Sequence, residues 1–170
     1  MRFRGLLISI LMAMSAPCMS GSGDIEVVVS NGAAHLHYWG DEMDLTPFGN
    51  SPAVDEAKIL FVKSKDHLSY VVIEINGSST VHGGSGHCGA GREGSLVWIK
   101  LRPSRVMDVS SVLLDSCGYS IEQISDHATN SALEIRYNSY GEDKRFVLKY
   151  DNDAPERGFS ISAKPLDHEK

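Results

Sequence analysis

The stretch DIEVVVSNGAAHLHYW, residues 24–39, decides the fold class. Asn31-Gly32 separates two runs that are rich in β-branched and aromatic residues. Both central positions of a two-residue hairpin turn need a positive φ, which asparagine and glycine adopt most readily. We therefore expect a β-hairpin here, and His35 and His37, two positions apart on its second strand, should lie on one face.

Similar strand-like runs follow along the rest of the chain. Residues 57–63 and 68–76 predict a second hairpin, and residues 131–139 and 145–151 predict another, while the proline-containing acidic segment 40–56 is expected to be a loop. Parallel strands would need helices of about ten or more residues between them, and no such helical pattern is seen. The sequence predicts an all-β fold, an antiparallel meander of about eight or nine strands closed as a sandwich or barrel.

The first 20 residues differ from the rest of the chain. Arg2 and Arg4 precede a short apolar run, and the small residues of APCMSGSG follow it. This is the plan of a secretory signal, and the apolar run is shorter than the about 20 residues of a spanning helix. We expect residues 1–20 to be a cleaved signal peptide and residues 21–170 to be a single β domain. The protein is then periplasmic or secreted, with no membrane anchor after signal cleavage.

The charge of the chain excludes one class of partner. Lysine and arginine number 16 against 22 aspartates and glutamates, a net charge of −6, and loss of Arg2 and Arg4 with the signal peptide makes the mature protein more acidic still. Such a surface repels nucleic acid and attracts basic proteins at long range. We expect a protein partner of basic charge and no nucleic acid.

Cysteine usage predicts one disulfide. Cys18 leaves with the signal peptide when cleavage falls after it, so Cys88 and Cys117 remain. An exported chain with one pair of cysteines most simply joins them. A metal pair or a nucleophilic Cys88 is the alternative, but neither cysteine lies in a zinc-type spacing.

The glycine-rich segment STVHGGSGHCGAGREGS, residues 79–95, is the most unusual part of the chain. Its GxGxxG match at residues 84–89 is followed by a strand-like run, so it lacks the helix that a dinucleotide site needs. We interpret the segment as a connection tethered at Cys88, where a binding function fits best. We assign no catalytic residue, metal ligand or cofactor; the candidate binding residues are His82, Ser85, His87, Arg92 and Glu93.

Three functions are compatible with these features. The first is an exported non-enzymatic β protein that binds another protein, such as an inhibitor or immunity-type partner of a basic hydrolase or toxin. The second is a small metal-assisted hydrolase that uses His82 and His87 with His35 or His37. The third is a carbohydrate-binding or structural module whose exposed aromatic residues line one face.

Overall fold

The computed structural model describes residues 25–79 and 91–166, which form strands and two short 3-10 helices. The predicted signal peptide lies outside the described residues. In chain order the elements are β1 (Ile25–Ser30), β2 (Ala33–Tyr38), β3 (Asp41–Asp44), η1 (Thr46–Phe48), β4 (Val54–Lys65), β5 (Leu68–Ser78), β6 (Arg92–Arg102), β7 (Arg105–Ser116), β8 (Ile121–Ala128), β9 (Ala132–Ser139), β10 (Lys144–Asp151), η2 (Pro155–Arg157) and β11 (Ser160–Pro165). No helix among these residues is long and apolar enough to cross a membrane.

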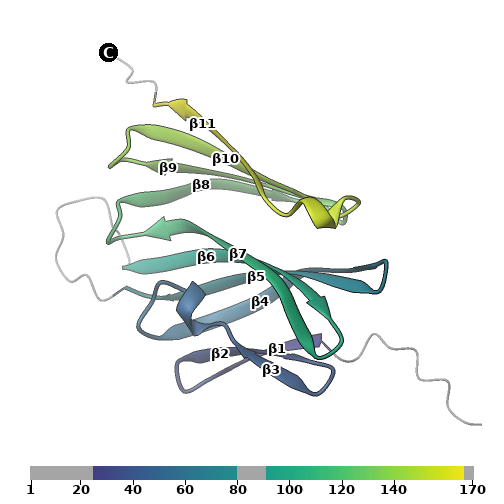
Figure 1. Cartoon of the computed structure of the whole chain (residues 1–170). Helices are drawn as coiled ribbons and strands as arrows, with labels where there is room; N and C mark the ends of the chain where they lie inside the picture. The colour runs from purple at the N-terminus through teal and green to yellow at the C-terminus, as the bar shows by residue number, and fades with distance from the viewer. Residues whose placement is uncertain (1–24, 80–90, 167–170) are drawn as a thin grey trace, which may run out of the picture.

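The strands form two sheets, and every pairing is antiparallel (Figure 1). β1, β2 and β3 make a three-stranded sheet, and β4 to β11 make an eight-stranded sheet in chain order. The all-β class and the antiparallel pairing are thus confirmed. The described residues form eleven strands in two sheets and not the predicted eight or nine, and their closure into a barrel is not observed. The predicted Asn31-Gly32 turn joins β1 to β2, with φ values of 52° and 78°.

The predicted loop over residues 40–56 is wrong in part, because β3 occupies its first residues. Asp41–Asp44 pairs with β2 across a second two-residue turn, Trp39-Gly40. The sequence DEMD has little strand propensity of its own. Pairing with β2, and packing of Met43 on the core, override that local preference.

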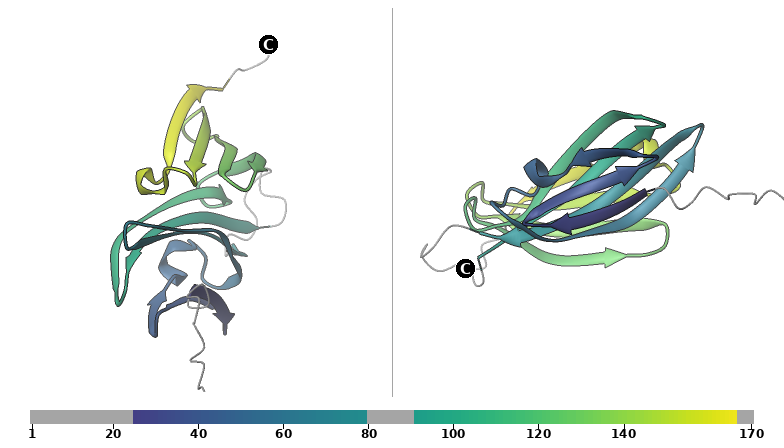
Figure 2. Two further views of the ribbon diagram at one scale, coloured as in Figure 1. Left: turned by 90° about the vertical axis from the view of Figure 1, so that its right-hand side faces the viewer. Right: turned by 90° about the horizontal axis from the view of Figure 1, so that it is seen from below.

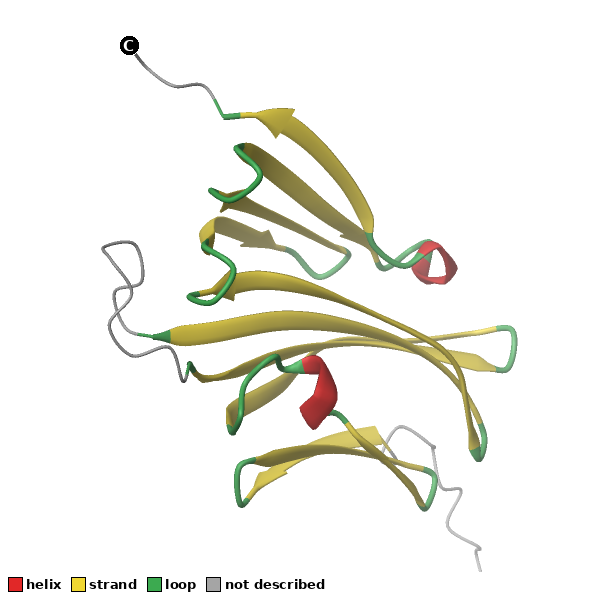
Figure 3. Ribbon diagram, turned by 60° about the vertical axis from the view of Figure 1, so that its left-hand side comes forward, coloured by secondary structure: helices red, strands yellow, loops and turns green. Residues whose placement is uncertain are grey.

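The eight-stranded sheet divides between β7 and β8, which share a single residue pair, Ser116↔Ile121. Beyond this pair the two strands diverge, so the sheet consists of a central ribbon, β4–β7, and a C-terminal meander, β8–β11. Figures 1, 2 and 3 show three layers, with the N-terminal sheet of β1–β3 on one face of the central ribbon and the meander beyond its other side.

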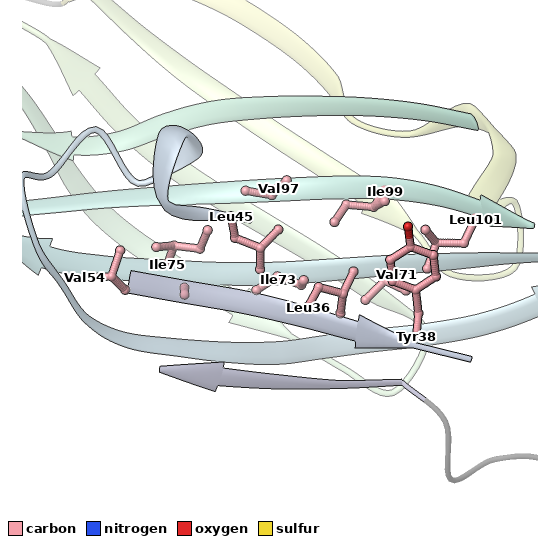
Figure 4. Close-up of a cluster of buried hydrophobic side chains, with 11 residues drawn as sticks. Leu36, Tyr38, Leu45, Val54, Val71, Ile73, Ile75, Val97, Ile99 and Leu101 are labelled. Atoms are coloured by element: carbon pink, nitrogen blue, oxygen red, sulfur yellow. The ribbon is translucent and has the colours of Figure 1, made fainter. Parts of the chain in front are cut away.

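Both faces of β5 and β6, the two inner strands of the central ribbon, are buried. Val71, Ile73 and Ile75 of β5 face the N-terminal sheet in a first core (Figure 4), while Tyr70 and Val72 belong to a second core shared with the C-terminal meander. Alternate residues of a strand point to opposite faces. The nearly continuous apolar runs of β5 and β6 therefore reflect burial on two sides.

Trp98 of β6 lies in the second core, with an exposed fraction of only 5%. Its neighbours Val97 and Ile99 face the first core, so the Trp98 ring points to the opposite face of β6. It is covered there by the C-terminal meander and by the β10–β11 connection, where a Cβ at Gly158 would lie 3.6 Å from Trp98 Cδ2. Its Nε1–H donates a hydrogen bond of 3.0 Å to the backbone oxygen of Pro155 in η2.

Tyr150 of β10 gives the second core a pH dependence. Burial, reinforced by the carboxylates of Asp151 and Glu156, raises the pKa of Tyr150 to about 12. In the unfolded chain the Tyr150 hydroxyl has its ordinary pKa of about 10. Below pH 10 it is therefore neutral in both states, and its full contribution to the stability of the folded protein is present. We expect the free energy of unfolding, measured by urea denaturation, to fall as the pH rises from about 10 to about 12. For Tyr150→Phe the free energy of unfolding should fall less steeply over this pH range. An equal slope in both proteins would contradict the assignment of the pH dependence to Tyr150.

Candidate functional site

The second core opens into a polar cavity at the end of the central ribbon where β5 and β7 finish and β6 begins. Along one face of β5 the sequence changes from Tyr70 and Val72 to Glu74 and Asn76. On β6 the change comes one pair later, because Trp98 and Leu96 face Val72 and Glu74. Gly94 and Arg92 follow, opposite Asn76 and Ser78. The cavity has a volume of about 240 Å³, and its lining residues are Glu74, Asn76, Arg92, Gly94, Asp115 and Gln123.

Gly94 makes room for this cavity. It pairs with Asn76 on one side and with Asp115 on the other. A Cβ atom at position 94 would lie 3.2 Å from Asn76 Oδ1 and 3.4 Å from Asp115 Cβ. Asn76, itself buried, donates from Nδ2 to Glu74 Oε1 at 3.3 Å, which fixes both side chains in the wall.

The cavity is electrostatically unfavourable for the Asp115 carboxylate. Burial raises the pKa of Asp115, and the carboxylates of Glu122 and Glu93 raise it further, while the Arg92 guanidinium opposes them. The pKa nevertheless stays above its ordinary value, so one guanidinium does not offset burial and the surrounding negative charge. A second cation entering the cavity would be attracted to Asp115 and Glu74.

Further acidic groups surround the cavity. A neighbouring hollow of about 280 Å³ shares Asn76 and Arg92 with it and adds the exposed side chains of Asp55 and Glu56. Ser78 Oγ donates to Asp55 Oδ2 at 2.7 Å. We call the group Asp55, Glu56, Glu74, Asp115 and Glu122, together with Arg92, the acidic end.

Two exposed tyrosines belong to turns beside the acidic end. Tyr119 is 63% exposed in the turn between β7 and β8, and Tyr140 is 39% exposed in the turn between β9 and β10. The backbone N–H of Tyr140 donates to Ser120 O at 3.0 Å, which joins the two turns. The Tyr140 hydroxyl donates to Glu122 Oε2 at 2.5 Å. The acidic end is therefore bordered by a polar aromatic surface.

The predicted binding residues divide into three groups. Arg92 lines the cavity, but it lies on β6 and not in a loop, because Ser78↔Arg92 pairing starts the strand there. Glu93 is only 3% exposed and accepts a hydrogen bond from Asn50 Nδ2 at 3.0 Å, so the prediction of an accessible loop residue is wrong for it. His82, Ser85 and His87 lie outside the described residues.

Of the two cysteines in the predicted disulfide, only Cys117 is among the described residues. Cys117 follows β7 directly, and its neighbour Ser116 pairs with Glu93 near the start of β6. Ser79 and Gly91, which bracket the segment that contains Cys88, hydrogen-bond to each other at the same end of the ribbon. Cys88 lies outside the described residues, and the Cys88–Cys117 bond stays a prediction.

His35 and His37 share the outer face of β2, as their spacing predicted. His35 Nδ1 lies 2.9 Å from Glu42 Oε1, and His37 Nδ1 lies 3.7 Å from Glu42 Oε2. Within residues 25–79 and 91–166, no group of three or more histidine, cysteine, aspartate or glutamate side chains is arranged to hold a metal ion. The histidine pair is therefore placed against one carboxylate on an outer surface.

Glu74, Asp115 and Gln123 were not predicted as site residues from the sequence. Two of them carry a signal, because Glu74 interrupts the apolar run VVIEIN and Asp115 ends the run SVLLDSC. Glu74 lies within β5, a strand that is otherwise buried on both faces, where a carboxylate needs a polar environment. Such interruptions indicate where an apolar core ends.

No protein-family model, curated protein or solved structure matches the chain. The functional assignment that follows rests on the described residues and on their chemistry.

Proposed function

We propose that this chain is an exported, non-enzymatic protein that binds a basic protein partner through the acidic end. An inhibitor or immunity-type partner of a basic hydrolase or toxin is the class that fits best. The observation that carries the proposal is the open cavity in which Glu74 and Asp115 outnumber Arg92, with exposed Glu56 and Tyr119 nearby.

Each part of this surface has a recognised role in association. Clustered carboxylates speed the encounter with a basic partner, and the effect decreases as salt screens the charges. Tyrosine is enriched at interfaces because it contributes a large, rigid contact area with a polar tip. A lysine or arginine side chain that enters the cavity would pair with Asp115, whose charged form is disfavoured by burial.

A capture experiment identifies the partner. The purified protein is immobilised and exposed to periplasmic and culture-supernatant extracts of its source at low and high salt. We expect one basic protein to be retained strongly at about 50 mM salt and weakly at about 500 mM salt. Retention that is insensitive to salt, or a retained partner of acidic charge, would contradict the role of the acidic end.

Glu56→Lys should weaken binding of the captured partner about tenfold at low salt, mainly through slower association. The side chain is exposed in the described structure, so reversal of its charge should not disturb the fold. The association rate is measured by surface plasmon resonance at several salt concentrations. Tyr119→Ala should instead speed dissociation, because it removes contact area and not charge.

Asp126→Lys is the matched control for Glu56→Lys. Asp126 is exposed on β8 toward the opposite end of that strand, and its reversal changes the net charge of the protein by the same amount. We expect its association rate to stay within about twofold of the original protein. An equal decrease of the association rate in both variants would show that only the net charge of the protein matters. It would contradict the assignment of the interface to the acidic end.

A further inference from the structure

A second hollow, of about 410 Å³, lies at the opposite end of the central ribbon from the acidic end. Its walls come from three hairpin turns, which join β2 to β3, β4 to β5 and β6 to β7. The turns supply Trp39, His67 and Pro103, and the adjoining strands supply Ser64, Leu68, Ser69 and Arg102. We call this hollow the Trp39 pocket; none of its lining residues belongs to the acidic end.

Trp39 and His67 occupy positions that their residue types disfavour. Their φ values are +48° and +63°, in the left-handed region that asparagine and glycine adopt at lowest cost. The same three-stranded sheet provides a comparison, because its other hairpin turn uses Asn31-Gly32 where this one uses Trp39-Gly40. Strained backbone that places a large ring at the mouth of a pocket points to a function for that ring.

Arg102, like Arg105 across the same turn, has no neutralising partner among the residues that the structure describes. Lys65 Nζ lies 2.9 Å from Glu156 Oε1, and Lys63 Nζ lies 3.9 Å from Asp153 Oδ1. The Arg102 guanidinium makes no ion pair or hydrogen bond with the residues that the structure describes, although it lines the pocket. An exposed guanidinium in this setting is suited to bidentate pairing with a carboxylate.

The remaining walls of the pocket offer apolar surface and hydroxyl groups to the ring of a small ligand. Trp39 packs on the first core and leaves part of its ring toward the pocket, where Leu68 and Pro103 add apolar surface. Ser64 Oγ and Ser69 Oγ share a hydrogen bond of 3.0 Å, so one of their two hydroxyl protons stays available to donate and both oxygens can still accept. The pocket thus combines a flat apolar wall, hydroxyl groups and a cation.

We propose that the Trp39 pocket binds an acidic monosaccharide, a sugar ring that carries a carboxylate. The apolar face of the ring stacks on Trp39, its hydroxyl groups bond to the Ser64–Ser69 pair, and its carboxylate pairs with Arg102. This site is independent of the acidic end, and its ligand has the opposite charge to the partner proposed there.

The test is isothermal titration of the purified protein with glucuronate and, separately, with glucose. The two probes share the ring and differ in the carboxylate. We expect glucuronate to bind at least about tenfold more tightly than glucose, because only glucuronate makes a charge-assisted hydrogen bond to Arg102. Equal binding of both sugars, or no glucuronate binding up to about 10 mM, would overturn the proposal.

Four variants locate the site. Arg102→Gln should weaken glucuronate binding about tenfold, whereas Arg105→Gln, across the same turn but outside the pocket, should leave it unchanged.

Trp39→Asn removes the ring while it supplies the residue type that the turn prefers. The protein should therefore stay folded in a thermal melt and lose binding of both sugars. Undiminished glucuronate binding by folded Trp39→Asn would overturn the stacking role. Glu56→Lys should not affect either sugar, which separates this site from the protein interface.

Discussion

Replacement of Trp98 by alanine is expected to lower the free energy of unfolding by about 3–5 kcal/mol. The ring is 95% buried between the central ribbon and the C-terminal meander, with its centroid 6.1 Å from that of Tyr70. Its loss would leave a cavity in the second core and would remove the hydrogen bond from Nε1–H to the Pro155 oxygen in η2, which would keep only the bond from Gly158 N–H. Urea denaturation monitored by circular dichroism measures the change.

Two further variants separate packing from hydrogen bonding at Trp98. Trp98→Phe keeps an aromatic ring but removes the donor to Pro155, so it should cost about 1–3 kcal/mol, less than alanine does. Trp39→Asn removes a tryptophan that is only half-buried, and it should cost less than Trp98→Ala. An alanine variant at position 98 that unfolds at the same urea concentration as the original protein would show that the meander does not depend on this contact.

Gly77→Ala is expected to destabilise the protein by about 3 kcal/mol although it adds a single methyl group. Gly77 lies on β5 directly beneath the segment that leads into β4. A Cβ atom there would lie 2.7 Å from Ser51 Cβ and still closer to Ser51 Oγ and the backbone oxygen of Ala53. These neighbours cannot move cheaply, because Ser51 Oγ also donates to Ser78 O at 2.8 Å.

The cost at Gly77 should extend to the N-terminal sheet. Val54 N–H donates to Gly32 O at 2.7 Å, and this bond links the start of β4 to the β1–β2 turn. Displacement of Ala53 would disturb that link. Gly141→Ala is the matched control, since a Cβ there would meet nothing closer than Tyr119 O at 3.9 Å, and its thermal midpoint should change little. Equal midpoints for the two variants would contradict the close approach at Gly77.

Much of the fold is predictable from local patterns in the sequence. Asn31-Gly32 predicts the first hairpin because asparagine and glycine adopt positive φ readily. The alternation of Leu133, Ile135 and Tyr137 indicates the strand that forms β9. The short strand β3 could not be predicted, because its residues have little strand preference and gain their conformation from β2. The burial of both faces of β6 also depends on a distant partner, the C-terminal meander, which local periodicity does not reveal.

The candidate site was predictable only in part. Arg92 was selected for its place beside the glycine-rich segment, and it does line the cavity. Glu93, selected on the same ground, faces the other way because successive strand residues alternate between faces. Glu74 and Asp115 come from strands that are distant in sequence, and only the pairing of β5, β6 and β7 brings them together.

The single pair between β7 and β8 has a consequence for the order in which the chain folds. Hairpins between consecutive strands close short loops, so the ribbon and the meander can each form at low entropic cost. The contacts that join them, such as Trp98 with Pro155 and Lys65 with Glu156, span 57 and 91 residues. Docking of the meander is therefore expected to be the late, rate-limiting event in refolding. Until it occurs, the apolar face of the ribbon and the unpaired edge of β7 stay open to association with other chains.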